Sequence, residues 1–192
     1  MAQTTYFLEH GAGDISGCPG TDQELPTSVH AVIHTLTLGT SEPVGTNWNE
    51  DLFGGQTRSG DWDCQLTLNV ASGGGAPNRV TVKVERVNSS CTPQETIFEE
   101  ETPTLTKSAT TQYECTGVAS KTVVFSSGEG VMITVWRSNG TQIVGLKYGS
   151  TPNNDSNITV PNIATPTPTP TATPTPTPTP EPVSGNTFFI GQ

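Results

Sequence analysis

The sequence predicts an all-β protein, an antiparallel β-sandwich of jelly-roll type with about eight or nine strands. Three observations support this fold class. Apolar residues recur with a period of two in several segments, and no segment of useful length has the 3.6-residue period of a helix. Only 31% of residues are hydrophobic, while Gly, Thr, Ser and Asn are plentiful. That composition suits half-buried strands joined by many turns.

The clearest strand signals lie in the middle of the chain. From Trp62 to Val70, apolar residues alternate with Asp, Gln, Thr and Asn, and from Val80 to Val84 valines alternate with Thr and Lys. Such alternation places the apolar side chains on one face of a strand. A Gly- and Pro-rich turn at 73–78 separates the two runs. We interpret them as an antiparallel hairpin, and a longer connection between two sheets is the alternative.

The other expected strands are shorter and separated by turn residues. Two long loops are expected, at 11–26 and 39–60, because Gly, Pro, Asp and Ser interrupt the apolar pattern there. No internal repeat is recognised outside a Thr-Pro run near the C-terminus. The remaining strands are expected at Tyr6–Leu8, Val29–Leu38, Tyr113–Cys115, Thr122–Ser126, Val131–Trp136, Ile143–Tyr148 and Asn157–Val160.

The composition divides the chain into three parts: a β-sandwich at 1–163, a Thr/Pro-rich extended linker at 164–182 and an apolar tail at 183–192. Each Pro in the linker lacks a backbone donor and has a fixed φ, so the linker is expected to be a polyproline II rod. At about 3.1 Å per residue, its Thr-Pro run spans roughly 50–55 Å.

The tail contains the cluster Phe188-Phe189-Ile190, and exposed apolar clusters usually dock on a partner. We therefore predict an assembly or docking role for these three residues. A frayed terminus without a partner is the alternative.

The charge and hydropathy exclude two classes of partner. The net charge is −10, with 8 Lys and Arg residues against 18 Asp and Glu residues, so the chain lacks the basic face that a nucleic-acid-binding protein needs. No apolar stretch approaches the ~18 residues of a membrane-spanning helix, and no membrane insertion is expected. The N-terminal residues show neither the charged nor the apolar region of a secretory signal.

The four cysteines are Cys18, Cys64, Cys91 and Cys115. None belongs to a C-x-x-C pair, so a zinc site or a thioredoxin-type redox site has no local support. Four cysteines permit three pairings, and the sequence does not choose among them. Buried thiols and disulfides both remain open, because the redox compartment is unknown.

Residues that could carry chemistry give weak signals. His30 and His34 lie about 13 Å apart if they share one strand, which is too far for one metal ion. No nucleophile elbow, P-loop or dinucleotide-binding motif is present. We therefore predict no catalytic residue, no metal site, no cofactor and no enzymatic activity. Trp48, in the second long loop, is the one candidate platform for stacking against a sugar ring, so a glycan ligand stays open.

Several segments resemble β-sandwich proteins of tailed phages and of environmental sequence data. They are Trp62–Leu66 (Trp-Asp-Cys-Gln-Leu), Arg79–Val82 and Glu85–Cys91, together with the opening segment Thr4–Leu8. Some members of that group also carry Thr-Pro runs near the C-terminus. The resemblance implies a virion surface protein, a capsid decoration or fibre component. It implies no catalytic residues.

Together these observations predict a structural protein of a viral particle that assembles through its linker and tail. Its partners would be other copies or other virion subunits, and it would lie on the virion surface after assembly in the host cytoplasm. Two alternatives remain. One is a secreted carbohydrate-binding or adhesion module, and the other is a subunit of an extracellular filament built by strand addition.

Overall fold

The protein's structure, a computed structural model, describes residues 3–10, 23–24, 34–38, 46–50, 55–71, 78–148, 156–164, 185 and 191. These residues form strands and turns and contain no helix, so none of them belongs to a helix that could cross a membrane. The strands make two sheets, and nearly all neighbouring strands are antiparallel. The predicted all-β sandwich is therefore confirmed.

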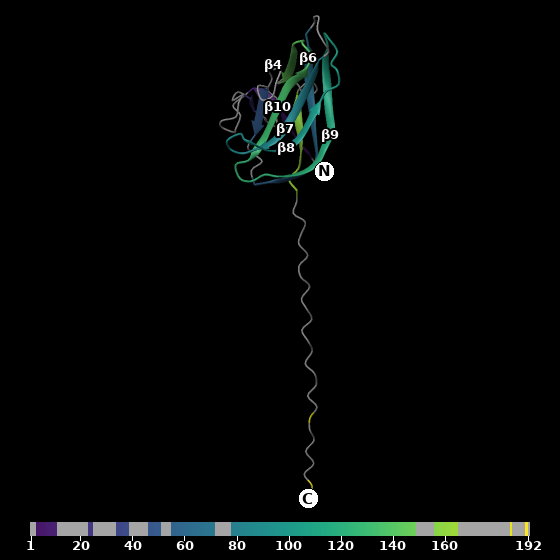
Figure 1. Ribbon diagram of the computed structural model, residues 1–192. Coiled ribbons are helices and arrows are strands. Elements are labelled where there is room, and N and C mark those ends of the chain that lie inside the picture. The colour runs from purple at the N-terminus through teal and green to yellow at the C-terminus, as the bar shows by residue number, and fades with distance from the viewer. Residues whose placement is uncertain are drawn as a thin grey trace.

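The first sheet has the strand order β1-β12-β6-β11-β4, with β9 paired to β6 as well. The second sheet has the order β2-β3-β5-β10-β7-β8, in which β3 and β5 are parallel. In Figure 1 the long strands β6 to β10 run along the length of the domain. The bounds in the first sheet are β1 Gln3–Phe7, β4 His34–Thr37, β6 Thr57–Val70, β9 Thr110–Val124, β11 Val144–Tyr148 and β12 Asn157–Pro161. Those in the second are β2 Glu9–His10, β3 Gln23–Glu24, β5 Thr46–Glu50, β7 Arg79–Val87, β8 Pro93–Glu101 and β10 Gly130–Asn139.

One continuous core lies between the two sheets. Alternate residues of β6, from Trp62 to Val70, meet the valines of β7 and the apolar row of β10, as the period of two predicts. Trp62 is completely buried. Each large apolar side chain removed from water in this way contributes about 1.5–3 kcal/mol.

The expected hairpin between the runs at 62–70 and 80–84 is wrong, and the alternative connection between sheets is found. Strand β6 belongs to one sheet and β7 to the other. Both strands carry a fully apolar row, and such rows can also be buried by facing each other across the core. β6 instead pairs along its length with β9, while β7 pairs with β8 and β10.

Two other boundaries differ from the expectation. The segments at 113–115 and 122–126, expected as separate strands, belong largely to the single long strand β9. The loop expected at 39–60 contains β5 and the beginning of β6. In both places the backbone hydrogen bonds to a partner strand stabilise a strand that the weak alternation of the sequence did not predict.

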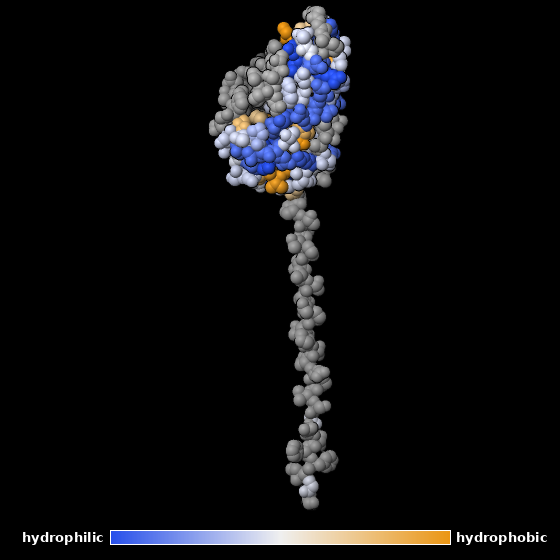
Figure 2. Space-filling view, viewed as in Figure 1, coloured by the Kyte–Doolittle hydropathy of each residue, from blue (hydrophilic) through white to orange (hydrophobic). Residues whose placement is uncertain are grey.

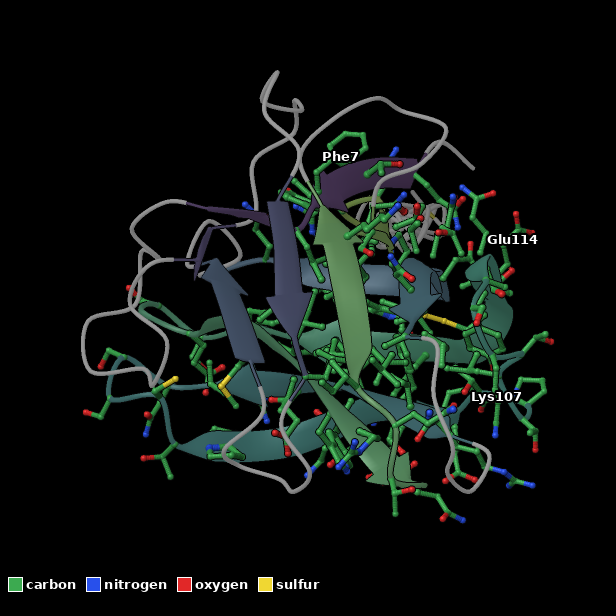
Figure 3. The ribbon with its side chains drawn as sticks, turned by 90° about the horizontal axis from the view of Figure 1, so that it is seen from above. Phe7, Lys107 and Glu114 are labelled. Carbon is green, nitrogen blue, oxygen red and sulfur yellow. A yellow bond between two sulfur atoms is a disulfide. The ribbon has the colours of Figure 1, made fainter. Side chains whose placement is uncertain are left out.

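A disulfide joins the two longest strands. Cys64 of β6 and Cys115 of β9 are directly opposite each other, with their Cα atoms 5.0 Å apart. Figure 3 shows the bond in yellow on the side of the domain where Glu114 is labelled. Cys91 is also disulfide-bonded, to a partner outside the described residues, and Cys18 lies outside them too.

We expect the double substitution Cys64→Ala and Cys115→Ala to lower the free energy of unfolding by about 2–5 kcal/mol, because the unfolded chain would lose a cross-link. Urea unfolding followed by tryptophan fluorescence measures the change. Cleavage of native protein by a protease without reduction should leave peptides from β6 and β9 linked. A loss below about 0.5 kcal/mol would contradict a stabilising role for this bond.

Candidate functional site

Strand β1 lies at the edge of its sheet, and β12 is its one neighbour among the described strands. The antiparallel register places Thr5 opposite Thr159 and Tyr6 opposite Ile158. The two threonine hydroxyls lie 3.2 Å apart. Tyr6 and Leu8 point into the core and are 5% and 1% exposed. β1 is therefore an edge strand, and strands at this position in a sheet can template a further strand.

The N-terminal end of β1 is also tied to β6. The Gln3 side-chain amide donates to the backbone carbonyl of Asp61 and to a carboxylate oxygen of Asp63, both at 3.1 Å. Phe7, at the other end of β1, is partly buried, and Figure 3 shows its ring at the periphery of the domain. The strand is thus docked by two inward side chains while its outward face remains partly accessible.

The chain leaves the domain beside this edge, through a segment we call the linker root, residues 162–164. After β12 the chain continues to pair with the beginning of β6: Ile163 bridges Arg58, and the Ala164 N–H donates to the Thr57 carbonyl at 2.7 Å. The sheet therefore holds the backbone as far as Ala164.

Arg58 is the side chain that holds the end of β12, next to the linker root. It is 6% exposed, and its guanidinium donates to the Pro161 carbonyl at 3.2 Å and to the Gln56 side-chain oxygen at 2.7 Å. Gly60, on the same strand, has φ +140°, and a Cβ there would lie 3.2 Å from the Pro161 Cβ. A glycine at this position lets β6 and the end of β12 approach closely.

An open hollow of about 350 Å³ lies at this corner, lined by Thr4, Arg58, Asn162 and Ile163. Ile163 is 54% exposed and presents an apolar side chain beside the hollow. The corner thus combines a sheet edge, a fixed point of exit for the linker and an exposed apolar side chain. Such features are found where a chain makes contact with another subunit.

The carboxylates away from this corner are mostly engaged in ion pairs on the second sheet. Arg79 contacts Glu101, and Arg86 contacts Glu129, both at 2.7 Å. Hydrogen bonds from Ser138 and then Arg79 lower the pKa of Glu101, and the Ser126 backbone N–H, with Arg86, lowers the pKa of Glu129.

Each of these carboxyl groups is therefore ionised at neutral pH, as it would be in water. Burial, with help from the nearby Glu100 carboxylate, raises the pKa of Tyr113, which stays protonated. Figure 2 shows hydrophilic residues, in blue, spread over the face on which β8 and β9 lie in Figure 1. The acidic run Glu99–Glu101 lies on β8, an edge strand of the second sheet.

The site residues predicted from the sequence do not lie at this corner in the part of the chain that the structure describes. The docking cluster Phe188, Phe189 and Ile190 lies outside the described residues, and so does His30. Trp48 lies in strand β5 and not in a loop, opposite Ile133 of β10. Among the described residues, no group of three or more His, Cys, Asp or Glu side chains could hold a metal ion.

Sequence reasoning missed Arg58 and the linker root. The one available signal was an arginine at an even position of the β6 pattern, in step with the buried Trp62 and Cys64. A buried arginine needs partners, and its partner Pro161 is more than a hundred residues away along the chain.

Comparison with known proteins shows the fold and not a family. No protein-family model matches the chain, and no curated protein matches it. The domain is similar to part of a CocE/NonD family hydrolase from Staphylococcus aureus, with a TM-score of 0.63 and 9% identity. It is also similar to part of an aminopeptidase from a marine sediment Thaumarchaeota archaeon, with a TM-score of 0.57 and 11% identity.

These likenesses cover 85% and 86% of this chain but 37% of each hydrolase, so the chain spans little more than a third of either protein. At such low identity they show a shared sandwich fold alone. Matches to a xylan-binding domain from Paenibacillus barcinonensis and to the VP2 particle of infectious bursal disease virus, with TM-scores of 0.40 and 0.35, are too weak to support an argument. The resemblance to phage decoration or fibre proteins has no support from a family model.

The prediction that the chain is not an enzyme is contradicted by this comparison. It assumed that a sandwich without catalytic motifs belongs among non-enzymes, yet the domain is similar to portions of a hydrolase and of an aminopeptidase. The assumption failed because a fold does not determine function, and catalytic groups can come from loops or from other parts of a longer chain.

The geometry at the linker root gives a direct stability test. We expect Arg58→Ala to lower the free energy of unfolding by about 2–3 kcal/mol, because it leaves a buried carbonyl without its charged donor. The matched control is Arg79→Ala, whose ion pair with Glu101 is solvent-exposed and worth about 0–1 kcal/mol. Urea unfolding of both variants measures the difference, and equal losses would contradict the role of Arg58.

Proposed function

We propose that this protein is a surface component of an extracellular particle, and that it assembles through its linker and C-terminal tail. A virion is the particle that the sequence resemblance favours, with a decoration or fibre component as the specific role. The partners would be further copies of the chain or other subunits of the same particle.

The linker root is the observation that carries this proposal. Backbone pairing of Ile163 and Ala164 with β6 means that the Thr/Pro segment begins from a fixed point. A stiff segment that starts from a fixed point can hold its far end at a defined distance. Phe188–Ile190 would then be held well away from the domain, where another subunit can bind it.

The disulfides support an extracellular setting. Every described cysteine is disulfide-bonded, and such bonds persist mainly in oxidising compartments. A particle surface exposed to the medium meets this condition, whereas the reducing cytoplasm does not. If assembly begins inside a host cell, we therefore propose that the bonds form after release.

The proposal predicts that mass in solution depends on the tail. Full-length protein should form oligomers in light scattering, and a truncation after Ala164 should be monomeric. The truncation keeps Asn162–Ala164 because these residues pair with β6. Its circular dichroism spectrum should retain the β-sheet signal, since the described sheets end there.

The matched control keeps the full length and replaces Phe188, Phe189 and Ile190 with Ser. This variant should also be monomeric if the apolar cluster drives assembly. Oligomers that survive both changes would contradict assembly through the tail. Monomeric full-length protein at all concentrations would contradict self-assembly.

A second candidate function comes from the likeness to a CocE/NonD family hydrolase. On this candidate the sandwich is the β portion of a hydrolase, as in the S. aureus protein that it matches over 85% of its length. Purified full-length protein should then hydrolyse p-nitrophenyl esters or amino-acid p-nitroanilides, and heat unfolding should abolish the activity. Turnover equal to that of buffer would count against it.

A further inference from the structure

The C-terminal tail repeats the sequence of the N-terminal edge strand. Thr5–His10 reads Thr-Tyr-Phe-Leu-Glu-His, and Thr187–Gln192 reads Thr-Phe-Phe-Ile-Gly-Gln. Two of the six positions are identical, and Tyr/Phe and Leu/Ile replace each other at two more. Tyr6-Phe7 and Phe188-Phe189 are the two places in the chain where aromatic residues are adjacent.

The structure shows that the matching positions are those that dock β1. Tyr6 and Leu8 are the inward residues of this segment, and their counterparts Phe188 and Ile190 have the same apolar character and similar size. Thr5, whose hydroxyl meets that of Thr159, has the counterpart Thr187. The positions that differ most, Glu9 and His10, lie beyond the part of the segment that pairs with β12.

The place that β1 occupies can accept a strand of this kind. We call it the β1 slot: the edge of β12 from Asn157 to Pro161 together with the Ser156 carbonyl, which accepts from the Leu8 N–H at 2.9 Å. Because backbone hydrogen bonds do not depend on side-chain identity, a strand with the same inward residues would make the same contacts. An edge strand can also leave without disturbing two neighbours at once.

The linker directs the tail to a different copy. Gln3, where β1 begins, is opposite Pro161, so the linker departs from the end of the slot at which a replacing strand must enter. To use its own slot, the chain would have to reverse direction after Ala164. A Thr-Pro rod of about 55 Å resists such a reversal because polyproline II is stiff over several residues.

We propose that Thr187–Gln192 of one copy enters the β1 slot of a second copy and displaces that copy's Gln3–Leu8. This inference rests on the proposed function and names the site that the tail would bind. The exchange replaces the contacts of β1 with similar contacts of the tail, as in domain swapping. Val183–Gln192 also carries no charged side chain, so an acidic neighbour would not repel it. Because donor and acceptor surfaces differ, the contact is head-to-tail and builds rings or open filaments.

Cross-linking at one predicted contact tests the proposal. In the variant Thr159→Cys, Thr187→Cys, the two thiols should come together as the hydroxyls of Thr5 and Thr159 do. A short bismaleimide should then give a ladder of covalent oligomers. Mixing ¹⁴N- and ¹⁵N-labelled protein before reaction should give linked 159–187 peptides that join the two labels.

Two controls define the background. A variant with Thr159→Cys and Thr177→Cys places the second thiol within the rod and should give at most a tenth of the linked product. A peptide of sequence Ser184–Gln192 should suppress the oligomer ladder, and a scrambled peptide should not. The substitution Tyr6→Ala weakens the docking of β1, so it should raise the yield of cross-linked product if the tail replaces β1. If the tail instead added as a further strand beside β1, the same substitution would lower that yield.

The outcomes separate this inference from the proposed function. Tail-dependent oligomers without a 159–187 link would leave assembly through the tail intact and overturn the β1 slot as its site. Links that are confined to single labels, with none joining ¹⁴N to ¹⁵N, would overturn exchange between copies. Monomers in light scattering together with no cross-link would overturn this inference and the self-assembly part of the proposed function.

Discussion

The pairing of β6 with its three neighbours is the constraint on which the rest of this structure depends. One edge of β6 pairs along its length with β9, and its other edge is divided between β12 and β11. The buried row from Trp62 to Val70 holds this strand against the opposite sheet. Because β6 is fixed on both edges and on one face, it fixes in turn the position of β12, of β1 beyond it and of the linker root.

Covalent and electrostatic contacts reinforce the same strand. The Cys64–Cys115 bond closes the β6–β9 pair, and the buried guanidinium of Arg58 closes the gap between β6 and the end of β12. A chain with only 31% hydrophobic residues has a limited core, so such links have a larger share in its stability than they would in a richer core. The exposed ion pairs on the second sheet contribute less, because water screens them.

The same arrangement relates stability to the proposed assembly. The strand that would be exchanged is the outermost of its sheet, so its release leaves the β6–β9 pair and the main core row intact. Local opening of an edge strand costs less than global unfolding. Because β6 holds the core and β1 can be exchanged, one copy can bind the tail of another copy without unfolding of its domain.

The amino-acid pattern by itself determined the fold class and the core rows of β6, β7 and β10. These depend on local alternation and composition, which a sequence displays directly. Which strands share a sheet, that Cys64 pairs with Cys115, and that Arg58 holds Pro161 were decided only by the tertiary structure, because each joins residues far apart in the chain. The likeness of the tail to β1 was present in the sequence, but two identities in six residues had no meaning until the burial of Tyr6 and Leu8 showed which positions dock the strand.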